Sequence, residues 1–184
     1  MIDKQKLEKG IEMFLKGLGI DISDQHFKGT PGRVAKAWAE YFGAGYEIDP
    51  KAYLNVEFSD DFDQMIIVKD IPLISHCAHH MVPFCGTAKV GYLPANKRIT
   101  GLSKLARVVQ GYAARLQIQE QLTRQIAQAI QDVLKPKGCG VIIEAEHFCM
   151  SRRGVRATGS KTITSYLMGS FRDEPETRAE FLRF

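Results

Sequence analysis

Residues 75–84 read Ser-His-Cys-Ala-His-His-Met-Val-Pro-Phe and lie between two apolar segments, Met65 to Ser75 and Phe84 to Leu93, that have the composition of strands. One thiol and two imidazoles occur within four positions of this connection, at Cys77, His79 and His80. A Cys-x-x-His spacing is common in zinc sites. The sequence therefore predicts two strands joined by a turn that carries metal ligands.

A second group of the same residue types lies far downstream, where Glu146-His147-Phe148-Cys149-Met150 ends another apolar run. Together the two segments predict a zinc site with the ligands Cys77, His80 and Cys149, because Zn²⁺ binds thiolate and imidazole with tetrahedral geometry. Three protein ligands leave a fourth position for water, which is typical of a catalytic site. His79 and His147 then remain beside the metal, and imidazole has a pKa suited to proton transfer near neutral pH.

The apolar run before Cys149 also predicts where its side chains point. Strand side chains alternate between the two faces of a sheet. One face of this run would carry Val141, Ile143, Ala145, His147 and Cys149. We therefore expect His147 and Cys149 on the same side of the sheet.

The remaining cysteines leave alternatives open. Cys85 is a rival metal ligand, but Pro83 and the strand-like segment after it make a return to the same ion less natural. Cys85 and Cys139 are otherwise expected as small core residues. A disulfide framework is disfavoured, because four irregularly spaced cysteines in 184 residues without a secretory signal indicate a reduced chain.

The composition is that of one globular domain, with 45% hydrophobic and 25% charged residues. No apolar run has the length needed to cross a membrane, and the first residues, Met-Ile-Asp-Lys, lack the apolar region of a secretory signal. We therefore expect a cytoplasmic protein with no membrane partner. The net charge of +4 fits an anionic partner. No nucleic-acid partner is expected, because the basic residues do not alternate with aromatic ones.

The order of elements predicts an α+β fold. Helical spacing over residues 3–17, and a second helix with Thr30 as N-cap and Pro31 in its first turn, predict a helical extension within residues 1–50. The predicted core, residues 60–184, continues from the first strand pair to helices at 102–113 and 119–134 and to closing strands at 140–149 and 161–168. The whole chain, 1–184, would be a single domain with a four-stranded antiparallel sheet and two helices between its strand pairs.

Two polar groups predict an anion site. The helix that begins at residue 102 carries Ser103, Arg107 and Gln110 on one face, and a helix N-terminus offers free amide donors to an anion. The cluster Arg152-Arg153-Gly154-Val155-Arg156 follows Cys149 closely and supplies guanidinium groups suited to phosphate contacts. An anionic phosphate substrate next to zinc is therefore expected.

Short motifs follow one another along about the last two-thirds of the chain. They are Cys77-Ala78-His79-His80, Val82-Pro83-Phe84, Gly91-Tyr92-Leu93-Pro94, Gly101 to Arg107, Gln117 to Thr123, His147-Phe148-Cys149-Met150, Arg153-Gly154-Val155, Ser160-Lys161-Thr162 and Thr177 to Leu182. In this order they closely resemble the GTP cyclohydrolase I family, zinc enzymes that open the imidazole ring of GTP. One departure is Ala78, where the family usually has Glu, a change that bears on the support of the metal ligands.

The resemblance implies a T-fold, in which the antiparallel sheets of several subunits join into a barrel. It also implies a homo-oligomer, usually a decamer of two pentamers with active sites between subunits. The implied reaction converts GTP and water to formate and 7,8-dihydroneopterin triphosphate, the first step of pterin and folate-type biosynthesis.

The same resemblance implies roles for individual residues. Zinc would be bound by Cys77, His80 and Cys149, and its water would add to C8 of the purine. His147 would protonate the imidazole nitrogen, and His79 would assist ring opening. Glu120, with Gln119 beside it, would bind guanine, since a buried carboxylate can accept two hydrogen bonds. The implied triphosphate contacts are Ser103, Lys104, Arg107 and Arg153.

Three other classes of protein are alternatives to this interpretation. A zinc nucleobase deaminase is excluded, because its His-x-Glu and Pro-Cys-x-x-Cys signatures do not occur. A non-catalytic binding module with structural zinc would need a fourth protein ligand, and only Cys85 is nearby. A T-fold relative with altered chemistry is disfavoured by the two spare histidines and the cationic cluster.

Overall fold

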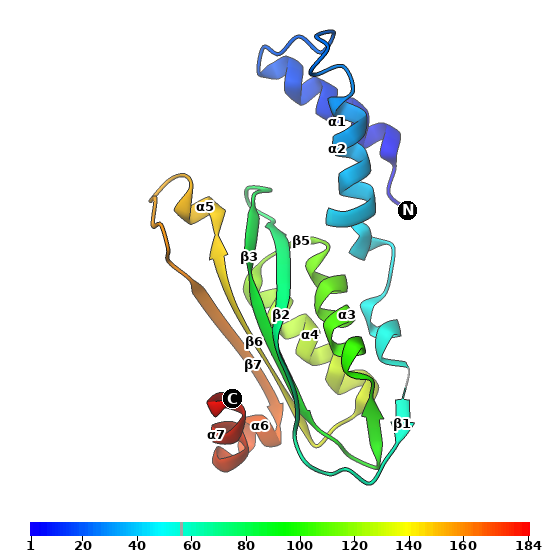
Figure 1. Ribbon diagram of the computed structural model, residues 1–184, viewed down its shortest axis with the longest axis vertical. Helices are drawn as coiled ribbons and strands as arrows, with labels where there is room; N and C mark the ends of the chain where they lie inside the picture. The colour runs from blue at the N-terminus through cyan, green and yellow to red at the C-terminus, as the bar shows by residue number, and fades with distance from the viewer. Residues whose placement is uncertain (56) are drawn as a thin grey trace.

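The computed structural model describes residues 1–55 and 57–184 and has a mixed α+β architecture (Figure 1). Its main sheet has five strands in the order β5-β2-β3-β6-β7. The four long strands pair antiparallel and are β2 (Ile66–Cys77), β3 (Pro83–Leu93), β6 (Gly138–His147) and β7 (Thr162–Gly169). The predicted four-stranded antiparallel sheet is therefore confirmed.

The fifth strand is an addition that the sequence did not predict. β5 (Leu116–Gln117) pairs in parallel with β2, opposite His76 and Cys77. A strand of this length shows no alternation of apolar and polar residues, so the sequence carries no signal for it. β5 also holds the end of β2, because the Ala78 N–H donates a hydrogen bond to the Gln117 carbonyl at 2.9 Å.

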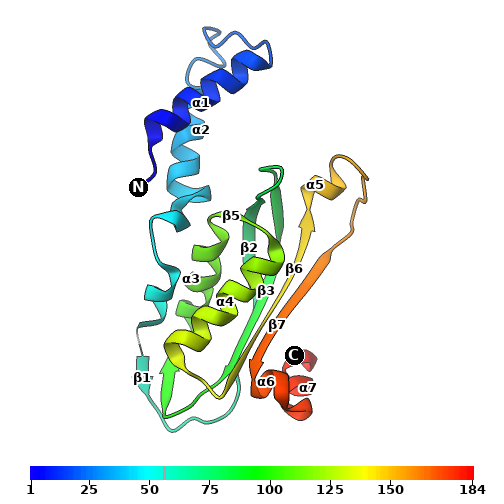
Figure 2. The ribbon, with the colours of Figure 1, turned by 180° about the vertical axis from the view of Figure 1, so that it is seen from behind.

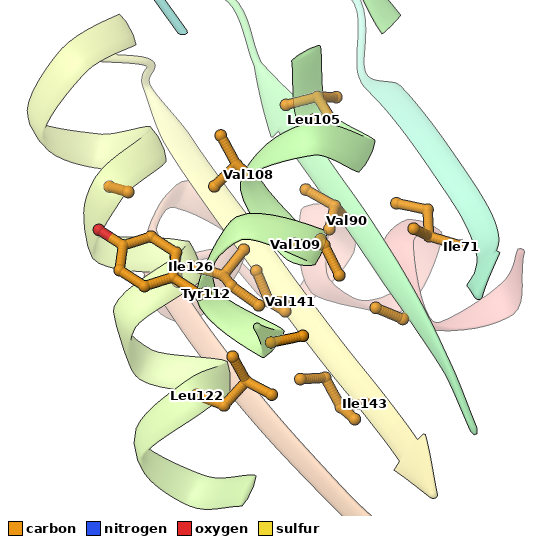
Figure 3. Close-up of a cluster of buried hydrophobic side chains, with 14 of the residues drawn as sticks. Ile71, Val90, Leu105, Val108, Val109, Tyr112, Leu122, Ile126, Val141 and Ile143 are labelled. Carbon is orange, nitrogen blue, oxygen red and sulfur yellow. The ribbon is translucent and has the colours of Figure 1, made fainter. Parts of the chain in front are cut away.

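Two helices cover one face of the sheet (Figure 2). They are α3 (Leu102–Ala113) and α4 (Gln119–Leu134), and both have the predicted bounds. Their apolar sides meet the inward-facing residues of the strands in a core shown in Figure 3, where Val109, Ile126 and Val141 are fully buried. Each such side chain stabilises the fold by roughly 1.5–3 kcal/mol relative to an exposed position.

The opposite face of the sheet is covered at one end by the C-terminal helices α6 (Ser170–Asp173) and α7 (Pro175–Arg183). Their buried rings, Phe171 and Phe181, lie with centroids 5.0 Å apart. They pack over Gly91 and Gly140, which face each other across β3 and β6. A Cβ atom on Gly140 would come within 2.8 Å of both rings, so glycine makes room for the aromatic pair.

The N-terminal helices α1 (Lys4–Gly17) and α2 (Thr30–Ala37) pack on each other beyond one end of the sheet (Figure 1). The prediction that Thr30 caps α2 is wrong. The N-cap is Gly29, and the Thr30 hydroxyl, already inside the helix, accepts a hydrogen bond from the Arg33 guanidinium at 2.9 Å. Pro31 does lie in the first turn, where its missing N–H costs no helical hydrogen bond.

Short elements lead from α2 to the sheet. They are the π-helix η1 (Trp38–Phe42), the 3-10 helices η2 (Ala44–Tyr46) and η3 (Pro50–Asn55), and a small antiparallel sheet of β1 (Glu57–Ser59) with β4 (Arg98–Thr100). Gly45 anchors this segment, because its N–H donates to the Ala114 carbonyl at 2.9 Å and its own carbonyl accepts from Arg115 Nε at 2.7 Å. Among the described residues, no helix combines the length and apolar character needed to cross a membrane.

Candidate active site

The turn between β2 and β3 brings two predicted ligands together. The Cys77 carbonyl accepts hydrogen bonds from the backbone N–H groups of His80, at 3.3 Å, and Met81, at 2.8 Å, which closes a tight turn. Met81 has a φ of 56°, in the left-handed region that non-glycine residues adopt rarely. This turn places His80 Nδ1 at 3.8 Å from Cys77 Sγ.

The third predicted ligand, Cys149, comes from a short helix. β6 ends at His147, and α5 (Phe148–Ser151) begins at the next residue. The prediction that Cys149 continues the strand alternation is therefore wrong, because helical geometry replaces the two-residue period after His147. His147 itself keeps the register of β6 and lies opposite the buried Phe84 of β3.

These residues form a group that can hold a metal ion. One ligand atom from each of Cys77, His80 and Cys149 lies within 4.8 Å of the other two. Cys77 is buried, Cys149 is half-buried and His80 is exposed, so the group opens to solvent on its histidine side. Burial raises the pKa of the Cys149 thiol, and the neighbouring Cys77 raises it further, because two adjacent thiolates would repel each other. A divalent cation between the thiols would reverse that balance by stabilising both thiolates.

Of the two spare histidines, His79 contacts this group, and His147 precedes Cys149 by two residues. The exposed His79 has its Nδ1 atom 3.8 Å from Cys77 Sγ. His147 stacks on the Phe84 ring, with centroids 4.5 Å apart and planes 7° from parallel, and its Nε2 lies 2.7 Å from Gln119 Oε1. Burial lowers the pKa of His147, while the negative charge of Glu120 acts in the opposite direction.

The predicted guanine-binding pair, Gln119 and Glu120, differs from its expected environment. Glu120 is exposed, not buried, and lines an open groove of 400 Å³ with Arg124 and Tyr166 among its walls. Gln119 is the buried member of the pair, at 1% exposure. Adjacent residues at the start of α4 point in different directions, so Glu120 reaches the groove and Gln119 reaches the sheet.

The predicted anion contacts are divided between two places. Arg153 follows α5 and is exposed close to Cys149, whose pKa its positive charge lowers. Ser103 and Lys104 lie in the first turn of α3, and this helix begins beside β4, at the end of the sheet away from α5 (Figure 1). Arg107, one turn further along, is exposed and lines a separate cavity of 640 Å³. Within one chain, the structure does not bring these α3 residues to the metal group.

His76, the neighbour of Cys77, was not predicted as a site residue from the sequence. The residue is 8% exposed, and its ring packs against both Trp38 and Phe42 of η1, with centroids 4.9 Å and 4.6 Å away. Burial lowers the pKa of His76. The four-residue spacing of Trp38 and Phe42 could have indicated an aromatic surface on a helix. That His76 packs on this surface depends on the tertiary structure, which the spacing does not show.

The fold and the site together are typical of an enzyme: an α+β chain with a three-residue group that could hold a metal ion, and with His79 next to Cys77. The family model of GTP cyclohydrolase I matches residues 7–184. The chain belongs to the GTP cyclohydrolase I family.

Curated relatives with the name GTP cyclohydrolase 1 resemble the chain over nearly its full length. The relative from Carboxydothermus hydrogenoformans is 51% identical over 180 residues, which cover 98% of this chain and 93% of the relative. The relative from Pelotomaculum thermopropionicum is 50% identical, with 98% and 95% covered, and that from Hydrogenobaculum sp. is 49% identical, with 100% and 98% covered. Among solved structures, the apo form of the archaeosine synthase QueF-Like is similar with a TM-score of 0.49 and 14% identity, over 60% of this chain and 97% of that one.

Proposed function

We propose that the chain catalyses the hydrolytic opening of the imidazole ring of GTP, giving formate and 7,8-dihydroneopterin triphosphate, the first step of pterin and folate-type biosynthesis. Its family and its relatives support this activity. The observation that carries it in the structure is the metal group of Cys77, His80 and Cys149 with His79 and His147 beside it.

Zn²⁺ is the metal proposed for this group. Two thiolates and one imidazole suit Zn²⁺ among the common divalent cations, and three protein ligands leave a coordination position open. When bound, Zn²⁺ would lower the pKa of water and thereby supply the nucleophile for attack on the purine. The exposed side of the group, at His80, is where substrate would enter.

The two spare histidines are proposed to handle protons. His147 would give a proton to the imidazole nitrogen of guanine, and His79 would assist when the ring opens. The support is positional: His79 lies 3.8 Å from a ligand sulfur, and His147 immediately precedes the helix that carries Cys149. General acid-base groups of this kind contribute about 100-fold to 10,000-fold to turnover.

The substrate contacts are proposed from the charged residues around the site. Glu120 would accept hydrogen bonds from the guanine edge, and its exposure on a groove near His147 supports access to the base. Arg153 would contact the triphosphate from the metal side. The remaining triphosphate contacts, Ser103, Lys104 and Arg107, would come from another copy of the chain.

Triphosphate contacts that come from two copies of the chain imply a homo-oligomer with active sites between subunits. A decamer of two pentamers is the proposed form. The sheet also supports it, because within the described residues β7 pairs only with β6 and β2 pairs with β5 at only two positions. Two open edges can pair with edges of other copies and close a barrel. On α1, the apolar side chains of Met13 and Phe14 are 75% and 63% exposed, which leaves a further surface for assembly.

A cytoplasmic location is proposed as well. All four cysteines are free thiols, and the metal group uses two of them in their reduced form. A reducing compartment keeps such thiols available.

The direct test is to incubate zinc-loaded protein with GTP and to measure formate release and pterin absorbance in the same reaction. We expect both products in equal amounts. Formate without a pterin would indicate altered chemistry on the same scaffold. Absence of both products from protein that has bound one zinc per chain would contradict the proposal and favour a non-catalytic zinc module.

A further inference from the structure

A contact with guanine does not explain the environment of the Gln119 side chain. Its side chain is buried at the start of α4, between that helix and the sheet. The amide nitrogen Nε2 lies 3.1 Å from the Ile143 carbonyl, 3.0 Å from the Thr162 carbonyl and 3.1 Å from Thr164 Oγ1. The amide oxygen Oε1 lies 2.7 Å from His147 Nε2.

These contacts fix which end of the amide faces which neighbour. Two of the three groups around Nε2 are backbone carbonyls of β6 and β7, which can only accept hydrogen bonds. An amide turned by 180° would place its oxygen against both carbonyl oxygens and lose these hydrogen bonds, each worth about 0.5–1.5 kcal/mol. The –NH₂ group therefore faces the strands, and Oε1 faces His147.

The orientation of Gln119 in turn decides where His147 carries its proton. Oε1 can only accept, so His147 Nε2 must be the donor. In the neutral ring the hydrogen is then on Nε2, and Nδ1 is the nitrogen with a free lone pair. The Phe84 ring, stacked at 4.5 Å, holds the imidazole plane and opposes a ring flip that would put a carbon atom in place of Nε2 against Gln119 Oε1.

We propose that Gln119 is a positioning residue that holds His147 in the Nε2–H tautomer, so that Nδ1 is the atom that exchanges a proton with the substrate. In the step itself, Nδ1–H of the imidazolium would break and the proton would pass to the imidazole nitrogen of guanine, which leaves a neutral ring with hydrogen on Nε2. This inference rests on the proton-transfer role proposed for His147. It also removes Gln119 from the guanine contacts, because both ends of its amide are already engaged.

The first test replaces Gln119 by leucine, which keeps the approximate volume and removes the acceptor. A matched control is available in Gln117→Leu, because Gln117 is also buried, at 4% exposure, and its amide bonds Tyr112 and Gln125 without reaching His147. Zinc content and melting temperature of both variants show whether each has folded. We expect Gln119→Leu to lower kcat by about 100-fold with KM for GTP within about twofold of the parent, and Gln117→Leu to keep kcat.

A second measurement separates positioning from guanine binding. In the His147→Ala background the group that Gln119 orients is absent, so adding Gln119→Leu should leave the Kd for GTP unchanged in calorimetry. A Kd weakened by about tenfold or more would make Gln119 a base contact and overturn the proposal. An unchanged kcat in folded, zinc-loaded Gln119→Leu would overturn it as well.

The atom assignment is tested with Gln119 left intact. Incorporation of Nδ1-methylhistidine at position 147 blocks the proposed atom and leaves Nε2 free to bond Gln119. We expect turnover to fall to the level of His147→Ala, with zinc retained, whereas retained turnover would overturn the assignment of Nδ1. Full activity of His147→Ala would instead show that the proton-transfer role proposed for His147 is wrong.

Discussion

At the scale of single residues, the four cysteines have different environments although they are chemically the same. Cys77 and Cys149 both belong to the metal group. Cys85, on β3, is half-buried, and Cys139 is fully buried in the core. Among the described residues, the ligand atoms that gather are those of Cys77, His80 and Cys149, and Cys85 is not part of this group. Burial raises the pKa of the Cys85 thiol, and Glu146 adds to this. The rival zinc site through Cys85 therefore has no support in the structure.

This difference predicts the metal content of two serine variants. Cys149→Ser should lose most bound zinc and activity, because it removes one of three ligands. Cys85→Ser should keep both. Zinc analysis of the purified variants, together with the formate assay, provides the measurement. Equal zinc loss in the two variants would move Cys85 into the metal site.

Cys139 predicts a loss of stability at high pH. Burial raises the pKa of its thiol from an ordinary 9.0 to about 12, and its S–H donates to the Ala127 carbonyl at 3.5 Å. The stabilisation is complete below the unfolded pKa, near 9, and is lost as the pH rises toward the folded pKa, because only the unfolded chain ionises in that window. The free energy of unfolding should fall by about 1.4 kcal/mol per pH unit from this residue.

Urea unfolding between about pH 8 and pH 11 measures that slope. Cys139→Ala serves as the reference, since it keeps the other alkaline titrations and removes the thiol. Its slope should be shallower than that of the parent. Parallel slopes would mean that Cys139 does not stay protonated in the folded chain.

At the scale of elements, the sequence predicted what depends on local periodicity. α3 and α4 have the expected bounds because each carries a continuous apolar stripe that the sheet buries. The sequence also predicted the group of Cys77, His80 and Cys149 from their residue types, and the structure brings these three residues together. Cys149 was assigned to the wrong element, since the change from strand to helix at Phe148 has no signal in an apolar run. β5 and the aromatic contacts of His76 depend on tertiary packing, which no local pattern records.

The surroundings of two glycines, one under α7 and one in α1, predict opposite effects of their substitution on stability. Gly140→Ala would place a methyl group within 2.8 Å of Phe171 and Phe181, and such overpacking costs about 1–3 kcal/mol. Gly10→Ala, in the middle of α1, meets nothing within 4 Å and should stabilise the chain by roughly 0.5–1 kcal/mol. Thermal unfolding of both variants gives the comparison. A Gly140→Ala variant as stable as the parent would show that the aromatic pair can shift.

At the scale of the whole molecule, the chemistry is divided between the two ends of the sheet. The metal group lies at the end formed by the β2–β3 turn and α5, whereas α3 begins at the other end (Figure 1). A helix rises about 1.5 Å per residue, so the first turn of α3 lies about 15 Å from its last residue. The resemblance implied all the anion contacts, but the sequence could not show that one chain separates them.

The proposed sites between subunits predict complementation between two inactive variants. Subunits with Cys149→Ser lack a metal ligand, and subunits with Arg107→Ala lack an anion contact that would serve a neighbour. If the two are unfolded together and co-refolded at equal amounts, random assembly should restore about a quarter of the parent activity, because such sites can combine intact halves from two chains. The separately refolded variants, mixed afterwards without exchange, are the control. No recovery in the co-refolded sample would place Arg107 and the metal in the same chain.

The charge of the substrate gives a further prediction for Arg153. Loss of one charge-assisted contact in Arg153→Ala should weaken kcat/KM for GTP by on the order of 1.5–3 kcal/mol. Guanosine lacks the phosphates, so it should be a poor substrate for both proteins and should show little further loss in the variant. Similar losses for the two substrates would mean that Arg153 supports the fold or the metal group.

The pairing of Phe84 with His147 across β3 and β6 also has a consequence for folding. A slip of one residue between these strands would turn His147 to the other face of the sheet and carry α5 away from the β2–β3 turn. Metal would bind only chains with the native register. This binding would shift the equilibrium from misaligned chains to native ones. The ion would thus select the native strand register during folding, before it takes part in catalysis. We expect a higher yield of native protein when refolding is done with Zn²⁺ than with a chelator, and equal yields would contradict this role.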